Sequence, residues 1–123
     1  MNEKDRIIID YLNDILESII NIKSFLKNID LPAFQKDIKT QYAVIRALEI
    51  IGEASKNIPK EVKENNSWTP WRFMAGMRDK LIHDYFGVDT EVVWNTATED
   101  IIEIRERYKS TRFRIFLASK AFI

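Results

Sequence analysis

Apolar side chains recur at helical spacing along most of the chain. From Asp5 to about Leu26 they fall every three or four residues, which predicts one long amphipathic helix. Its stripe is Ile8, Tyr11, Leu12, Ile15, Ile19, Ile22 and Leu26. Further apolar residues, Ile7, Leu16, Ile20 and Phe25, widen that stripe. So broad an apolar surface indicates packing on more than one neighbour, or a subunit interface.

A second long helix is predicted from Pro32 or Ala33 to Asn57, after an interruption at residues 30–32. One face carries Phe34, Ile38, Gln41, Ile45, Leu48 and Gly52, and the adjacent face carries Val44, Ala47, Ile51 and Ala54. Gly52 and Ala54 are small, so another helix can approach closely. Pro59 is expected to end this helix.

A third helix is predicted from residue 70 to residue 85 or 86. The polar stretch 60–66 before it has room for one short helical turn. Thr69 is a good N-cap, and Pro70 suits the first helical position, where no backbone N–H is needed. Gly87 fits the C-terminal stop.

A fourth long helix is predicted from Asp89, its cap, to about Tyr108. Its stripe is Val93, Ala97, Ile101, Ile104 and Tyr108. Residues 110–123 mix basic and apolar side chains, and either an amphipathic tail or a strand-like end fits them. We therefore expect one helical domain over residues 1–109 and a separate tail over 110–123.

Short connections between long helices favour antiparallel packing. The fold class predicted is all-α: an up-down bundle of four main helices, with an additional short helix possible. Gly and Pro number three each among 123 residues, which favours long helices over a sheet of short strands.

The composition of the chain excludes several kinds of functional site. The chain has no cysteine, so disulfides and thiolate metal sites are excluded. With one histidine, a zinc site within one chain is not expected, and no cofactor is implied. The formal net charge is zero, so any nucleic-acid contact needs a local patch. No apolar run suits a signal or a membrane span, and we expect a cytoplasmic protein.

The segment 77–86 concentrates the residues that could carry chemistry. It holds the single histidine, His83, together with Arg78, Asp79 and Tyr85. Histidine exchanges protons near neutral pH, and the arginine fork matches phosphate oxygens. Together they suit attack of an RNA 2′-hydroxyl on its own phosphodiester, a reaction that needs no metal.

Helix geometry limits how Arg78 and His83 could act on the same phosphate. Asp79 and His83 share a face and could hydrogen-bond. Arg78 and His83 diverge by about 140° on an ideal helix. Bringing both to one phosphate therefore needs the length of the arginine side chain, a distorted turn, or a second copy across a two-fold axis.

The same residues could instead have purely structural roles. His83 could be a hydrogen-bonded structural residue beside Asp79. Arg78 could form a surface ion pair, and Tyr85 could be a half-buried aromatic at a rim.

The string Arg78-x4-His83-x-Tyr85 resembles the Arg-x4-His-x-Tyr signature of the HepT-like toxins in the HEPN superfamily. Flanking segments are similar too: 44–54, Trp71 with Met77, 85–89, and Val93-Trp94. The resemblance covers about residues 5–108, in order. It implies a helical homodimer whose two signature helices meet at a cleft, and a metal-independent endoribonuclease that is the toxin of a toxin–antitoxin pair.

The same resemblance implies roles for single residues. Arg78 would hold the scissile phosphate and His83 would act as acid or base, while Asp79 would orient or polarise the site. Tyr85 would line the cleft and accept AMP from a partner, a minimal nucleotidyltransferase that silences the toxin. The added bulk and negative charge would exclude RNA.

The alternative is a non-catalytic helical dimer or adaptor that binds a protein partner through its broad apolar faces. Basic residues that could touch RNA backbone are Arg72, Lys80, Arg105, Arg107, Lys109, Arg112 and Arg114. Trp68, Trp71 and Trp94 could stack on bases or anchor a core.

Overall fold

The computed structural model describes the backbone of residues 2–83 and 89–106, and the side chains of 2–77 and 89–106. The described elements are all helical: α1 (Glu3–Phe25), α2 (Leu31–Lys36), α3 (Ile38–Lys56), α4 (Lys60–Asn65), α5 (Trp71–His83) and α6 (Thr90–Asn95). A π-helical segment, η2 (Thr96–Asp100), continues α6, and α-helix resumes over residues 101–106. The expected all-α class is confirmed.

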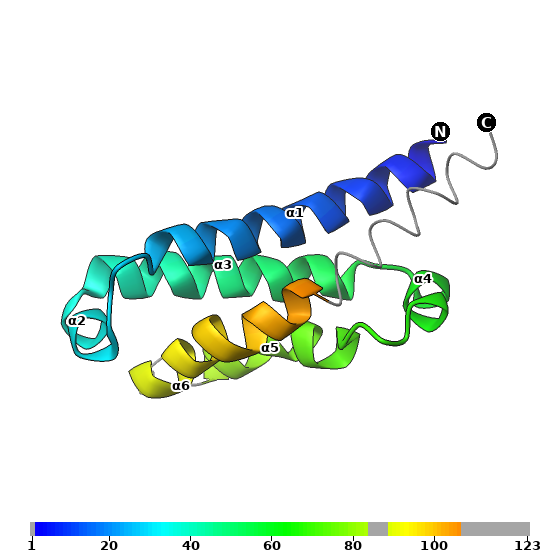
Figure 1. The fold of residues 1–123 in the computed structure, drawn as a ribbon. Helices are drawn as coiled ribbons and strands as arrows, with labels where there is room; N and C mark the ends of the chain where they lie inside the picture. The colour runs from blue at the N-terminus through cyan, green and yellow to red at the C-terminus, as the bar shows by residue number, and fades with distance from the viewer. Residues whose placement is uncertain (1, 84–88, 107–123) are drawn as a thin grey trace.

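α3 is the central helix of the bundle. α1 and α5 both pack against it, and they run in the opposite direction to it (Figure 1). The α6–η2 segment runs in the opposite direction to α5, and α6 contacts α2 and α3 (Figure 1). α2 and α4 lie at opposite ends of the molecule (Figure 1). This is the up-down arrangement expected from the short connections.

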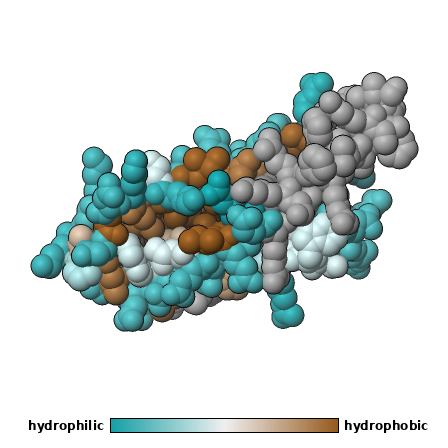
Figure 2. Space-filling model, viewed as in Figure 1, coloured by the Kyte–Doolittle hydropathy of each residue, from teal (hydrophilic) through white to brown (hydrophobic). Residues whose placement is uncertain are grey.

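Most of the core comes from the apolar stripes predicted from the sequence, and Ile58, Trp71, Met74 and Met77 complete it. α1 contributes Ile8, Leu12, Ile15, Ile19 and Ile22; α3 contributes Val44, Ala47, Leu48, Ile51 and Ala54; the last helix contributes Val93, Ala97, Ile101 and Ile104. On the face seen in Figure 2, apolar surface also gathers over α1 and α3, bordered by hydrophilic side chains. No helix in the described part of the chain is long and apolar enough to cross a membrane.

The predicted helix from residue 32 to residue 57 is wrong in one respect, because it is broken at Asp37. Asp37 adopts φ −111° and ψ 87°, outside the helical region, and its side chain caps α3 by accepting from the Thr40 amide. The break changes the register of the two segments. Phe34 is buried, whereas Ile38, expected on the same face, is 64% exposed.

Tertiary contacts explain why the break is favourable. The rings of Phe34 and Trp94 lie 5.5 Å apart between centroids, and Gln35 Nε2 donates to Thr90 Oγ1 at 3.3 Å. α2 therefore turns to pack on α6, which a continuous helix would not allow.

The other boundaries follow the predictions closely. α4 is the short turn expected within 60–66, and α5 begins one residue after Pro70, whose carbonyl accepts from the Met74 amide at 3.0 Å. Asp89 caps α6 as expected, through the Glu91 and Val92 amides. The proposed stop at Gly87, the tail 110–123 and its boundary at residue 109 lie outside the described residues.

Candidate functional site

Helix α5 carries most of the sequence signature, and its position is fixed by its first two turns. Trp71, Met74 and Met77 are buried on the side that faces α3. The indole Nε1 of Trp71 donates to the carbonyl of Asn66 at 3.1 Å, which ties the start of α5 to the end of α4. Asn66 in turn donates from Nδ2 to the carbonyl of Val62 at 2.8 Å. The helix that bears the candidate residues is therefore anchored firmly at its N-terminal end.

Arg78, Asp79 and His83 belong to the last two turns of α5, as expected. Their backbone is described, and so is that of Lys80, but their side chains fall outside the described set. Tyr85, the expected target of modification, lies outside the described residues altogether.

The register of α5 separates position 78 from position 83. Position 78 is seven residues after the buried Trp71, so it continues the side of the helix that faces the bundle. Position 83 is eleven residues after the exposed Arg72 and lies within about 20° of it around the axis. Within one chain, the two signature positions therefore occupy different faces of α5.

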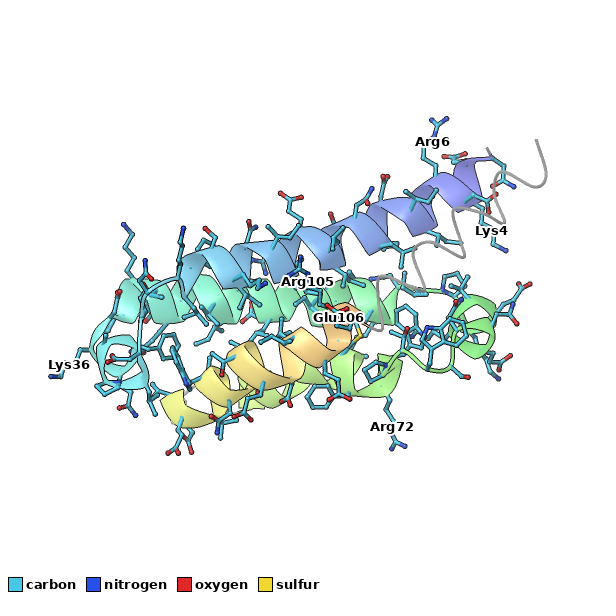
Figure 3. The ribbon with its side chains drawn as sticks, in the orientation of Figure 1. Lys4, Arg6, Lys36, Arg72, Arg105 and Glu106 are labelled. Carbon is cyan, nitrogen blue, oxygen red and sulfur yellow. The ribbon has the colours of Figure 1, made fainter. Side chains whose placement is uncertain are left out.

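Of the basic residues proposed to contact RNA backbone, the structure describes the side chains of two, Arg72 and Arg105. Arg72 is exposed and stands out from the start of α5, away from α3 (Figure 3). Arg105 is partly buried, and its Nε atom has no hydrogen-bond partner among the described residues. Arg107, Lys109, Arg112 and Arg114 lie outside the described residues.

Trp71 and Trp94 do not form a surface on which bases could stack. Trp71 is 6% exposed and packs in the core, and Trp94 packs on Phe34. Both act as anchors, the second of the two roles considered from the sequence.

A feature that the sequence reading missed lies where α4 meets α5. An open hollow of about 770 Å³ is lined by Lys60, Lys63, Glu64, Trp71, Arg72 and Phe73, and we call it the basic hollow. One signal could have revealed it: two lysines three residues apart in the polar stretch, placed by a short turn near Arg72.

No metal-binding cluster is found in the described part of α5, and the described residue with a shifted pKa lies in another part of the fold. Within the residues described, no group of three or more His, Asp or Glu side chains is placed to hold a metal ion. The described group with a clearly shifted pKa is Asp37, in the α2–α3 break and not in α5.

Comparison with known proteins identifies relatives over most of the chain. The family model described as "Ribonuclease HepT-like" matches residues 15–111. A protein of Thermococcus cleftensis named "Probable ribonuclease HepT" is 55% identical over 103 residues, which cover 84% of this chain and 94% of that protein.

Two further relatives carry similar names. A "Putative RNase" of Methanocaldococcus jannaschii is 48% identical, over 80% of this chain and 82% of its own length. A "Putative RNase" of Caldanaerobacter subterraneus is 46% identical, over 80% of this chain and 88% of its own length. No solved structure matches the chain.

Proposed function

This chain belongs to the ribonuclease HepT-like family, and from that premise we propose that it is an endoribonuclease that cuts RNA without a metal ion. The observation that carries the proposal is the match of residues 15–111 to that family, with Arg78-x4-His83 inside the matched region. We further propose that it acts in the cytoplasm as the toxin of a toxin–antitoxin pair.

The chemistry assigned to the two residues is balanced within RNA itself. His83 accepts the proton of a 2′-hydroxyl, whose oxygen then attacks the adjacent phosphorus. The bond from phosphorus to the 5′-oxygen breaks, that oxygen takes up a proton, and a 2′,3′-cyclic phosphate and a 5′-hydroxyl result. Arg78 neutralises charge on the phosphate oxygens during the attack, and Asp79, on the face of His83, orients the imidazole.

The direct test uses purified protein, an RNA substrate and EDTA. Wild type should cut the RNA and leave cyclic phosphate ends, detectable by mass. His83→Ala should lower the rate by about 10²-fold or more, because proton transfer by a positioned side chain is typically worth that much. Unchanged circular dichroism and an unchanged Tm would show that the variant is folded. Full activity of the variant would refute the assignment.

Silencing is proposed to occur by AMP transfer to Tyr85 from a partner nucleotidyltransferase. The phenolic oxygen of Tyr85 attacks the α-phosphorus of ATP, pyrophosphate leaves, and the phenolic proton passes to a base or to water. A bulky, negatively charged group beside a phosphate-binding site would repel RNA.

The partner enzyme and ATP should therefore add the mass of one AMP to the wild type and abolish cutting. Tyr85→Phe should keep its mass and its activity under the same treatment. No mass change in the wild type would reject this mode of regulation.

Self-association is part of the same proposal, since one chain separates positions 78 and 83. Exposed apolar side chains on the bundle, such as Ile38 and Tyr42 at the start of α3, are available for such contacts (64% and 61% exposed). The same exposed residues would equally suit the alternative of a non-catalytic adaptor. An adaptor would form complexes without cutting RNA at any protein concentration, so the His83→Ala comparison distinguishes the two.

A further inference from the structure

We propose that the basic hollow between α4 and α5 binds the RNA strand on one side of the cut, so that α5 carries the strand from the hollow to position 83. This inference rests on the proposed ribonuclease function and adds to it a contact surface for the substrate. It concerns residues outside the Arg78-x4-His83-x-Tyr85 signature.

The charges of the hollow favour a polyanion. Among the described residues that line it, there are three cations, Lys60, Lys63 and Arg72, and one carboxylate, Glu64, although the whole chain has zero net charge. The one ion pair there joins Lys60 Nζ to Glu64 Oε1 at 3.6 Å, with side chains 90% and 64% exposed. An ion pair that is so exposed contributes little to the stability of the fold, and Lys60 can exchange Glu64 for a phosphate at little cost. Lys63 and Arg72 have no ion pair within the described part of the chain.

An exposed aromatic ring adds a second kind of contact. Phe73 lies beside Arg72 in the lining of the hollow and is 46% exposed, although it neighbours the buried Trp71 and Met74. Cations that follow a backbone, combined with an aromatic face on which a base can stack, are the usual combination in single-strand binding.

The side of α5 that is exposed at Arg72 and Gly76 continues, by helical spacing, to positions 79 and 83 of the signature helix. Arg72, Gly76, Asp79 and His83 follow one another at spacings of four, three and four residues, so these positions lie on one side of the helix. Gly76 is exposed, and a Cβ added to it would meet no other atom of the described residues within 4 Å. Packing among the described residues therefore does not require a glycine there, whereas its small size leaves room for a strand along this side.

The distance from the hollow to position 83 matches the length of a few stacked nucleotides. Positions 72 and 83 are eleven residues apart along α5, which corresponds to about 16 Å of rise. At about 3.4 Å per stacked nucleotide, that distance corresponds to about five nucleotides. Sites for small molecules normally bury most of the surface of the ligand. The hollow is open rather than enclosed, so it suits a polymer that passes over it better than a small molecule.

The test compares two triple variants with an equal change in charge. The first, the hollow variant, is Lys60→Gln, Lys63→Gln and Arg72→Gln. The control is Lys23→Gln, Lys27→Gln and Lys36→Gln, at exposed positions near the opposite end of the bundle, where Figure 3 shows Lys36 at the end of α2. Each is assayed for cutting of a ten-nucleotide RNA and of a dinucleotide, and for binding of the ten-nucleotide RNA by fluorescence anisotropy.

The hollow variant should raise KM for the ten-nucleotide RNA about ten-fold or more, and its salt dependence should weaken by about two units of slope, since each lost phosphate contact removes about 0.7. The dinucleotide is too short to reach the hollow and should be cut at the wild-type rate. Phe73→Leu should weaken binding of the longer RNA roughly five-fold or more through lost stacking. The control variant should match the wild type.

The remaining outcomes separate this inference from the ribonuclease proposal. Equal losses on both substrates, or equal effects of the hollow and control variants, would overturn the strand-binding role and leave the nuclease intact. A change in oligomeric mass instead of RNA binding would assign this face to a second copy of the chain, again against the inference. Wild-type protein that neither cuts nor binds the longer RNA would overturn both.

Discussion

Asp37 shows how one side chain ends one helix and begins another. Its Oδ1 accepts from the Thr40 amide at 3.1 Å, and its Oδ2 accepts from the Thr40 hydroxyl at 2.6 Å. Gln41 Nε2 donates to the Phe34 carbonyl at 2.8 Å, which also accepts from the Asp37 amide at 3.2 Å at the end of α2. Side-chain bonds of this kind offer the backbone an alternative to a continuous helix.

The same contacts predict a pH-dependent effect on stability. The hydrogen bonds from Thr40 lower the pKa of Asp37 below its ordinary value of 3.8. A carboxyl with a lowered pKa in the folded state stabilises the protein above its ordinary pKa, and this contribution is lost as pH falls through the lowered value.

Asp37→Ala should therefore lower Tm by a constant amount near neutral pH, and the difference from wild type should shrink below about pH 3.8. Thermal unfolding followed by circular dichroism from pH 7 to pH 2 would measure this. Asp37→Asn, still a good N-cap, should lose less than Asp37→Ala. A difference that does not change with pH would contradict the cap's dependence on charge.

At the scale of the element, α5 carries a glycine that the packing of the described residues does not explain. Gly76 lies in the middle of the helix, where glycine costs about 0.5–1 kcal/mol relative to alanine. Its φ is not positive, so an alanine can adopt the same conformation.

Gly76→Ala should accordingly raise the Tm of the protein by a few degrees, as measured by calorimetry. If a strand of RNA passes over this position, Gly76→Gln should leave Tm at or above the wild-type value but raise KM for long RNA. An unchanged KM in Gly76→Gln would count against the path along α5.

The last helix shows a second effect at this scale. Its buried residues Val93, Ala97 and Ile101 recur every four residues, a spacing that drifts by about 40° per step on a regular α-helix. The π-helical segment at 96–100 widens the helix there and offsets that drift. Hydroxyl groups support it, since Thr96 donates to the Val92 carbonyl and Thr98 to the Trp94 carbonyl.

At the scale of the whole molecule, the separation of positions 78 and 83 bears on how many chains make one site. If each site takes Arg78 from one protomer and His83 from its partner, a heterodimer of Arg78→Ala with His83→Ala retains one intact site of two. Each homodimeric variant retains none.

Co-expression with two different tags, followed by sequential affinity purification, would yield that heterodimer. Its turnover should reach about half of the wild-type value, and both variant homodimers should be inactive. An inactive heterodimer would mean that both groups come from the same protomer, brought together by a distorted turn near the end of α5.

The sequence by itself determined the order of the main helices and most residues of the core, because apolar spacing and caps such as Asp89 act over a few neighbouring residues. It also located Arg78, Asp79 and His83 on one helix and their separation around its axis. It could not decide the break at Asp37 or the exposure of Ile38, because these depend on Phe34 packing against Trp94, 60 residues later in the chain. The basic hollow likewise exists only once α4 folds against the start of α5, since its charges come from two separate segments.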